Sequence, residues 1–314
     1  MIHIADLHCD SLTYAYDNSF ALDDSRLHLS PARIPQGYRW LQVMAIFVPD
    51  HLRGPAAREY FESVYRFYLE HIRTHPGQIT PIDNLCKTKI SMREQGRFFN
   101  SILSVEGGSV LEGNPANVNA LYEKGVRLLT LTWNGANELC GGVMSGGGFT
   151  AAGREVVRRM EAFGMIVDVS HISDEGFYEL CGFAEKPFIA SHSNARDICP
   201  HPRNITNQMF REIVRRRGLV GLNYYDRFIL DGGGSAAIDD LLRHVYHFLE
   251  LGGEDVLALG SDFDGADVPD YLSGADKIPD FISALYRSGI PGDTITKILS
   301  QNVMRFFAEN GGCS

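Results

Sequence analysis

Short apolar segments alternate with longer segments of helical periodicity along most of the chain. The short segments are rich in β-branched and aliphatic residues, which favours strands. In the longer segments, such as 57–71 and 238–251, apolar residues recur every three or four positions, as in helices that bury one face. This alternation is typical of a parallel sheet with helical crossovers. The predicted strands are 2–9, 41–48, 101–105, 127–132, 165–170, 187–191, 219–224 and 256–261.

Eight strands that alternate with helices predict an α/β fold, the (β/α)8 or TIM barrel. A chain of 314 residues is long enough for two domains, yet single barrels often reach this size. No linker rich in proline, serine or glycine divides the sequence. We therefore expect one domain over residues 1–314.

Five of the predicted strands run into polar or ionisable residues at their C-terminal ends. In a (β/α)8 barrel these ends meet on the face that carries the active site, so we expect the side chains to lie around one opening. The five polar ends are His8-Cys9-Asp10, Glu106-Gly107-Gly108, Asp168-Val169-Ser170-His171, Ser191-His192-Ser193 and Ser261-Asp262-Phe263-Asp264-Gly265.

The first of these ends carries two ligand-type side chains at alternate positions. Alternate residues of a strand share a face, so His8 and Asp10 can bind one ion while Cys9 points the other way. His171 and His192 are 21 residues apart, one βα repeat, which predicts imidazoles on neighbouring strands.

Glu106 completes a set of five nitrogen and oxygen ligands, with His8, Asp10, His171 and His192. Such a set suits two divalent ions bridged by Glu106, with zinc favoured by the imidazoles and manganese or cobalt as alternatives. A pair of ions lowers the pKa of a bridging water molecule and polarises a carbonyl group. The pattern therefore predicts a metal-dependent hydrolase.

Other motifs are less informative. We interpret six histidines as surface or packing residues, namely His28, His51, His71, His75, His244 and His247. His201 lies in a loop near the site, and its role is ambiguous. The glycine-rich segment 139–150 is compatible with either a lid or a linker.

Charge and cysteine content restrict the partners and the compartment. The net charge of −10 argues against a nucleic acid or an anionic membrane as partner. No apolar run approaches the length of a membrane span, and the first residues do not resemble a signal peptide. The six cysteines form no CxxC pair, so we expect free thiols and a cytoplasmic protein. The six are Cys9, Cys86, Cys140, Cys181, Cys199 and Cys313.

Six motifs in the same order resemble the membrane (renal-type) dipeptidase family. They extend from residue 6 to residue 265, and the segment that follows is similar to the closing helices of that family. Six ordered motifs are far more specific than one HxD pair. The motifs are Asp6-Leu7-His8-Cys9-Asp10, Ser104-Val105-Glu106-Gly107-Gly108, Val167-Asp168-Val169-Ser170-His171, Ser191-His192-Ser193-Asn194-Ala195-Arg196, Cys199-Pro200-His201-Pro202-Arg203-Asn204-Ile205 and Gly260-Ser261-Asp262-Phe263-Asp264-Gly265.

The resemblance implies a binuclear zinc barrel that hydrolyses dipeptides, often with a D-residue at the C-terminal position. It implies that His8 and Asp10 bind one zinc, that His171 and His192 bind the other, and that Glu106 bridges them. It also implies that Arg203 pairs with the substrate carboxylate and that Asp262, rather than Asp264, lies next to the bridging water. Both roles suit the side chains, because arginine matches a carboxylate and an aspartate can act as a general base.

One position departs from the family pattern. Mammalian-type members carry a histidine after the fourth strand that contacts the scissile carbonyl, and this chain has Trp133 there. Loss of that donor removes an oxyanion contact that can be worth a few kcal/mol. The Trp133 indole, or the amide of Asn134 or Asn137, can replace it, so we expect Trp133 and Asn134 to contact substrate.

The sequence therefore predicts a zinc dipeptidase in which a bridging hydroxide attacks the peptide bond of a small dipeptide. A homodimer is one assembly left open. One alternative is a related hydrolase that acts on N-acyl amino acids, lactones or esters. Another is a metal-binding barrel without catalysis. This alternative is suggested by Trp133, which stands where mammalian-type members have the histidine.

Overall fold

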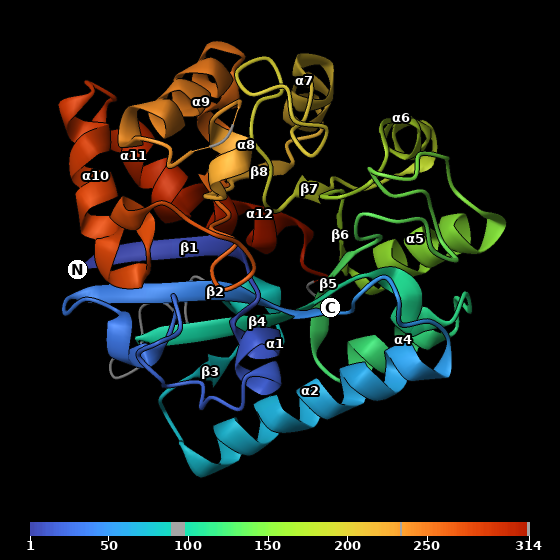
Figure 1. Ribbon diagram of the computed structural model, residues 1–314. Helices are drawn as coiled ribbons and strands as arrows, with labels where there is room; N and C mark the ends of the chain where they lie inside the picture. Colours follow the sequence, from blue (N-terminus) through green and yellow to red (C-terminus); the bar gives the residue numbers. More distant parts are fainter. Residues whose placement is uncertain (89–97, 233, 313–314) are drawn as a thin grey trace.

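Parallel strands that alternate with helices form a closed ring in the computed structural model, which describes residues 1–88, 98–232 and 234–312 (Figure 1). Eight strands follow one another around the ring, and the pairing of β2 with β4 closes it. The fold is therefore a TIM barrel, as the sequence predicts. The ring strands are β1 (Ile2–Cys9), β2 (Tyr38–Phe47), β4 (Phe99–Glu106), β5 (Val126–Thr130), β6 (Ile166–Asp168), β7 (Ile189–Ala190), β8 (Leu219–Leu222) and β9 (Leu257–Leu259).

A ninth strand, β3 (Thr80–Pro81), lies outside the ring. It pairs with the start of β4, on the edge that β5 occupies from Leu103 onward. The sequence pattern gives no sign of β3, because two residues show no periodicity.

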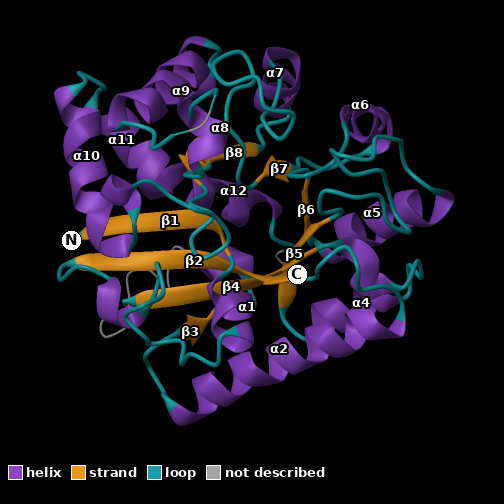
Figure 2. Ribbon diagram, in the orientation of Figure 1, coloured by secondary structure: helices purple, strands orange, loops and turns teal. Residues whose placement is uncertain are grey.

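Helices surround the strands (Figure 2). Three of them begin at a residue whose hydroxyl accepts a hydrogen bond from the first turn, namely Thr150, Ser173 and Thr206. The helices are α1 (Ser11–Asp17), α2 (Pro55–Thr74), α4 (Asn117–Glu123), α5 (Ala151–Phe163), α6 (Asp174–Phe183), α7 (Asn207–Arg215), α8 (Asp226–Ile229), α9 (Ile238–Glu250), α10 (Ile278–Arg287), α11 (Gly292–Thr296) and α12 (Asn302–Asn310).

Apolar side chains from all eight ring strands meet in one buried cluster with α12. Val303, Phe306 and Phe307 of α12 belong to this cluster and are fully buried. Burial of each such side chain contributes about 1.5–3 kcal/mol, so α12 is a stabilising part of the barrel. The interior is thus filled with apolar groups, while ionisable groups collect where the strands end.

Six ring strands, β2, β5, β6, β7, β8 and β9, end one or two residues earlier than the sequence pattern predicts. β6 ends at Asp168, β7 at Ala190 and β9 at Leu259. The residues that follow leave the regular ladder because their backbone groups bond to buried side chains, as when Ser170 and Ser191 donate N–H to Asp168. The polar strand ends therefore form turns that carry the site.

The glycine-rich segment 139–150 packs closely against the turn after β6. Val143 donates its N–H to the His171 carbonyl at 2.8 Å, and the Ser173 hydroxyl donates to the Gly147 carbonyl at 2.5 Å. A Cβ atom at Gly141 or Gly142 would collide with backbone oxygens, so glycine is required at both positions. The segment is a packed loop that supports His171.

The cysteines agree with the prediction in part. Cys9, Cys140, Cys181 and Cys199 are free thiols. Cys86 is disulfide-bonded, so the prediction of a free thiol is wrong there. Pairing depends on which segments the fold brings together, and this is invisible in the spacing of cysteines along the chain. Cys313 lies outside the described residues.

Among the helices of the described residues, none has the length and apolar character needed to cross a bilayer. That residues 1–314 form one domain remains a prediction.

Candidate metal centre

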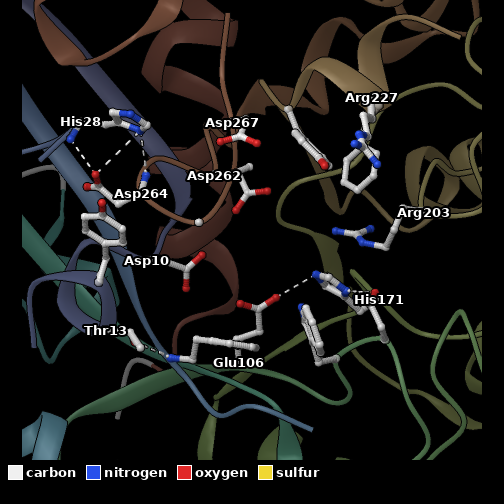
Figure 3. Close-up of a pocket in the computed structure, with 18 of the residues that line it drawn as sticks. Asp10, Thr13, His28, Glu106, His171, Arg203, Arg227, Asp262, Asp264 and Asp267 are labelled. Atoms are coloured by element: carbon white, nitrogen blue, oxygen red, sulfur yellow. Dashed lines mark hydrogen bonds and ion pairs between the residues drawn. The ribbon is translucent and has the colours of Figure 1, made fainter. Parts of the chain in front are cut away.

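A cavity of about 790 Å³ opens where the ring strands end. Figure 3 shows the carboxylates of Asp10, Asp262 and Asp264 on one side, and His171, Arg203 and Arg227 on the other. Glu106 lies between the two groups. Seven of the nine predicted site residues line this cavity, and His8 and His192 are buried directly behind it in contact with Glu106. The seven are Asp10, Glu106, Trp133, Asn134, His171, Arg203 and Asp262.

β1 carries His8 and Asp10 to the cavity through a β-bulge. Asp6 pairs with Gln42, but Cys9 pairs with Met44, so β1 has one more residue than β2 over this stretch. His8 Nε2 lies 3.3 Å from Asp10 Oδ2, as the sequence predicts for a shared ion. The bulge, rather than regular alternation, directs the imidazole. Cys9 is buried in the apolar core.

The two oxygens of Glu106 contact different imidazoles. Oε2 lies 3.4 Å from His8 Nε2, whereas Oε1 lies 2.8 Å from His171 Nε2 and 3.6 Å from His192 Nε2. Gly107 follows with φ 105°, and a Cβ atom there would lie 2.8 Å from the Val48 carbonyl oxygen. Only glycine lets the chain turn so sharply after Glu106, and the carboxylate then faces both sets of ligands.

Hydrogen bonds at Nδ1 orient the other two imidazoles. His171 Nδ1 lies 2.9 Å from Asn134 Oδ1, which can only accept, so the proton is on His171 Nδ1. Ser191 Oγ donates to Asp168 Oδ2 at 2.6 Å and therefore accepts from His192 Nδ1 at 2.7 Å. Both Nε2 atoms are left with a lone pair, the arrangement in which histidine binds a metal.

This donor set fits divalent cations. The Nε2 atoms of His171 and His192 lie 3.0 Å apart, and both face Glu106 Oε1, so acceptors converge without a proton between them. Asp10 Oδ1 is buried without a hydrogen-bond partner. Such converging acceptors repel one another unless a cation lies among them. Within the described residues, two overlapping groups have metal-binding spacing, one of His8, Glu106 and His192 and one of His8, Asp10 and Asp262.

The electrostatic environment differs from one ligand to the next. Burial lowers the pKa of His8, but the carboxylates of Glu106 and Asp10 overcome it and raise that pKa well above its ordinary value. Burial, with Arg203 and His8 nearby, lowers the pKa values of His171 and His192 well below the ordinary value. Burial raises the pKa of Glu106 to about 7.

Three residues at the cavity have a left-handed backbone, although none is glycine. The φ angles are 67° for His171, 60° for Asp262 and 66° for Asp264. This conformation costs a non-glycine residue roughly 1–3 kcal/mol and is kept where the surroundings demand it. Here the strained turns direct side chains from β6 and β9 into the cavity.

Arg203 is 4% exposed and has no carboxylate partner among the described residues. Its guanidinium donates to the His192 carbonyl at 3.0 Å and to Ser193 Oγ at 3.3 Å, while Nε has no partner. Burial lowers the pKa of Arg203. A buried cation without a counter-ion is costly, so the site favours an anionic ligand at this point.

Asp262 and Asp264 are both near the centre but are used differently. Asp264 accepts hydrogen bonds from the Ser11 hydroxyl at 2.5 Å and the His28 N–H at 2.7 Å, and so ties down the loop after β1. Asp262 Oδ1 lies 3.9 Å from His8 Nε2, and Oδ2 accepts from Asn223 Nδ2 at 2.9 Å. Burial raises the pKa of Asp262 to about 6. A carboxyl group with a pKa near neutrality suits proton transfer.

Trp133 and Asn134 lie on the cavity wall after β5. The Trp133 ring is 5.1 Å from Phe47 and 6.1 Å from His171, centroid to centroid. The side-chain oxygen of Asn134 accepts the hydrogen bond from His171, so the side-chain N–H groups of Asn134 remain available to a ligand. Asn137 binds the backbone of its own loop through both ends of its amide, which leaves Trp133 and Asn134 as the candidates for the oxyanion contact.

Several residues of the centre escaped the sequence analysis. Ser191 and Asp168 support His192, and Asn223 binds Asp262. Two histidines interpreted as surface or packing residues have more specific positions. His28 lines the cavity and packs against Phe263, whereas His244 is a buried packing residue that also forms hydrogen bonds. Ser191 and Asp168 both belong to polar strand ends that the sequence pattern singles out, whereas Asn223 had no such signal.

Comparisons with known proteins agree with this geometry. The family model described as membrane dipeptidase (peptidase family M19) matches residues 1–311. A Klebsiella pneumoniae protein described as an uncharacterized protein in the pqqA 5′ region is 34% identical over 215 residues, which cover 65% of this chain and 79% of that one. Matches to dipeptidases of Schizosaccharomyces pombe and Claviceps purpurea are 31–32% identical, and there the chain spans about half of the relative's length.

Two solved structures show the same fold. The crystal structure described as dipeptidase AC, a metallopeptidase of family M19, has a TM-score of 0.93 at 24% identity and covers 100% of this chain and 99% of that one. A metallopeptidase from Rhodobacter sphaeroides, solved with a phosphinate mimic of the dipeptide L-Ala-D-Ala, has a TM-score of 0.91 at 23% identity and covers 99% of both chains.

Proposed function

The chain belongs to the membrane dipeptidase family, peptidase family M19, and from this premise we propose that it is a metal-dependent dipeptidase. The observation that carries the proposal is the position of Glu106, whose two oxygens contact imidazoles from opposite sides of the cavity. This position supports a site in which Glu106 would be shared by two ions, with His8 and Asp10 holding one and His171 and His192 the other.

The proposed ions are two Zn²⁺, because three of the five ligands are imidazoles, and Mn²⁺ or Co²⁺ are alternatives. Divalent ions in such a site supply hydroxide near neutral pH and polarise the carbonyl that is attacked. We propose a cytoplasmic location as well. Assembly as a homodimer remains a prediction.

Asp262 is the proposed proton carrier. Its carboxylate accepts a proton from the attacking water molecule and returns it to the nitrogen of the leaving amine, as the general base becomes the general acid. Its pKa of about 6 supports this role, since the group is then ionised at neutral pH and still able to hold a proton briefly. Asn223 holds the second oxygen, which leaves Oδ1 on the side of His8.

The cavity is polarised in a way that suits a free dipeptide. Arg203, buried without a counter-ion, is the proposed partner of the substrate carboxylate. The aspartates on the opposite side favour the ammonium group at the other end of the substrate. Trp133 and Asn134 line the same cavity next to His171, and we propose that they contact the scissile carbonyl.

This polarity also separates the dipeptidase from the alternatives. A lactone or simple ester has no carboxylate for Arg203, and an N-acyl amino acid has no ammonium group for the acidic side. The phosphinate mimic of L-Ala-D-Ala bound by the Rhodobacter sphaeroides protein supports a dipeptide substrate and the inclusion of a D-residue.

The test is a matched set of substrates with the zinc-loaded protein. L-Ala-L-Ala and L-Ala-D-Ala are compared with their N-acetyl and methyl ester forms, and metal content is measured on the same sample. We expect hydrolysis of at least one free dipeptide. Blocking either end should lower the rate of hydrolysis by at least about tenfold, because each blocking group removes a charged contact. Absence of turnover on every dipeptide, or equal turnover of the blocked forms, would contradict the proposal.

A further inference from the structure

A second arginine lies on the same side of the cavity as Arg203 and has no part in the proposed reaction. Extending the proposed function, we infer that Arg227, with His201, forms a second anion subsite that favours dipeptides whose C-terminal residue has a carboxylate side chain. The substrate class is therefore a dipeptide that ends in aspartate or glutamate.

Arg227 is exposed and unpaired at the cavity wall. It comes from the short helix α8 after β8, and Figure 3 shows it on the side of Arg203 and His171. In the part of the chain that the structure describes, no carboxylate pairs with its guanidinium. Arg26, which also lines the cavity, is in contrast paired with Asp24 at 2.6 Å. The guanidinium of Arg227 is thus available to a ligand.

Several contacts hold Arg227 at a fixed place relative to Arg203. The Phe228 carbonyl accepts hydrogen bonds from the amides of Asn194 and Asn204, at 3.3 and 2.9 Å. Both asparagines are fully buried in the segment that carries Arg203. The Phe228 ring lies 5.3 Å from the Arg203 guanidinium. Because α8 is tied to the Arg203 segment, the backbone at Arg227 has a fixed place relative to Arg203.

His201 completes the subsite. It lines the cavity, and its ring lies 4.6 Å from that of Phe228. Its Nδ1 accepts the N–H of Arg203 at 3.2 Å, so the remaining proton is on Nε2, which can donate to an anion. Burial first, and then the guanidiniums of Arg203, Arg227 and Arg196, lower the pKa of His201.

The substrate chemistry follows from this arrangement. When Arg203 holds the α-carboxylate, the side chain of the same C-terminal residue starts two bonds away and lies on the same side of the cavity. Arginine binds a carboxylate through paired, charge-assisted hydrogen bonds, which an amide of equal size cannot match. The subsite should thus distinguish aspartate from asparagine, and glutamate from glutamine.

The experiment measures a ratio of kcat/KM values within isosteric pairs. Zinc-loaded protein is assayed with Ala-Asp against Ala-Asn and with Ala-Glu against Ala-Gln, each with an L- or a D-residue in second place. We expect at least one acidic substrate to be preferred by about 10- to 100-fold, the worth of a charged hydrogen bond. In Arg227→Met the ratio should fall to near one, and in Arg227→Lys it should be partly kept.

Arg26→Met is the matched control, because it removes a cavity arginine that already has a partner, and its ratio should stay as in the wild type. Melting temperature and metal content of each variant verify that it is folded and loaded. A wild-type ratio near one, or a ratio that survives Arg227→Met, would overturn the subsite while leaving the dipeptidase intact. Failure to hydrolyse any dipeptide would overturn both.

Discussion

The two sides of the metal centre place the same imidazole group in opposite electrostatic settings. On the acidic side, the ends of β1 and β9, the carboxylates of Glu106 and Asp10 keep the pKa of His8 high in spite of burial. On the imidazole side, the ends of β6 and β7, burial and the cations Arg203 and His8 keep the pKa values of His171 and His192 low. The acidic side supplies negative charge of its own. On the imidazole side, hydrogen bonds from His171 and His192 to neutral side chains orient the Nε2 lone pairs. The negative charge on this side comes from Glu106.

The largest effect is expected where the two sides meet. Among the described residues, Glu106 alone offers a carboxylate that contacts both His8 and His171, so we expect Glu106→Gln to lose at least one ion. Turnover should fall by more than about 10,000-fold, because the ions supply several kcal/mol of transition-state stabilisation. Metal analysis and dipeptide assays test this, with Glu112→Gln, outside the cavity, as control. Two tightly held ions in Glu106→Gln would show that the sides are independent.

The next effect is confined to the acidic side. Asp262→Asn keeps the size and the contact with Asn223 but removes the group that carries the proton. We expect kcat to fall by about 100- to 10,000-fold with metal content unchanged. Asp270→Asn, an exposed change in the same segment, should leave kcat as it is. Loss of an ion in Asp262→Asn would instead make Asp262 a ligand.

Two serines allow a matched test of the imidazole side. Ser191 and Ser261 are both buried, and each directly precedes a residue of the centre. Ser191 contacts His192 Nδ1, whereas Ser261 donates to the His8 carbonyl oxygen and so does not orient an imidazole. Ser191→Ala should weaken metal affinity by about 10- to 100-fold, as loss of such an outer contact does elsewhere. Ser261→Ala should weaken metal affinity far less. Metal affinity is measured by competition with a chelator, and an equal loss of affinity in the two variants would contradict the comparison.

The smallest effect concerns the support of the imidazole side. His244 of α9 accepts the Ala195 N–H at Nδ1 and donates from Nε2 to the Ile229 carbonyl, so it joins the segment after β7 to α8. Burial lowers the pKa of His244 to about 4, so below pH 6.5 the unfolded chain binds the proton more readily than the folded one. Stability from this group is complete above pH 6.5 and is lost as the pH falls toward 4.

Between pH 7 and pH 5 this loss amounts to about 2 kcal/mol. Urea unfolding of the metal-free protein at both pH values should show that His244→Gln lacks this part of the pH dependence. His247→Gln, on the same helix, should keep it, since His247 is only half-buried and binds Asn207. If the free energy of unfolding of His244→Gln depended on pH as in the wild type, His244 would not stabilise this side of the centre.

The barrel could be predicted because its signals are local. Each ring strand buries a short aliphatic run, and each crossover helix repeats its apolar positions, so periodicity alone gives the order of elements. The strand β3 and the early ends of β6, β7 and β9 could not be predicted, because they depend on partners far away in the sequence. The same is true of the disulfide at Cys86.

The proposed ligands stand out in the sequence for a different reason. His8, Asp10, Glu106, His171 and His192 each stand at the end of an apolar run, where an ionisable residue is conspicuous. Their supports are ordinary polar residues. Ser191 and Asn134 acquire their roles only when the turns after β7 and β5 bring them to an imidazole nitrogen. His244 is 52 positions beyond His192 in the sequence, and nothing in the pattern of α9 links it to the centre.

The left-handed turns at His171, Asp262 and Asp264 have an evolutionary consequence. Glycine would adopt these φ angles without strain, so a glycine at any of the three positions would relax the backbone, yet it would delete a side chain of the centre. Selection for a more stable fold and selection for the centre therefore act in opposite directions at these positions. A descendant released from the need for the centre should drift to glycine here first.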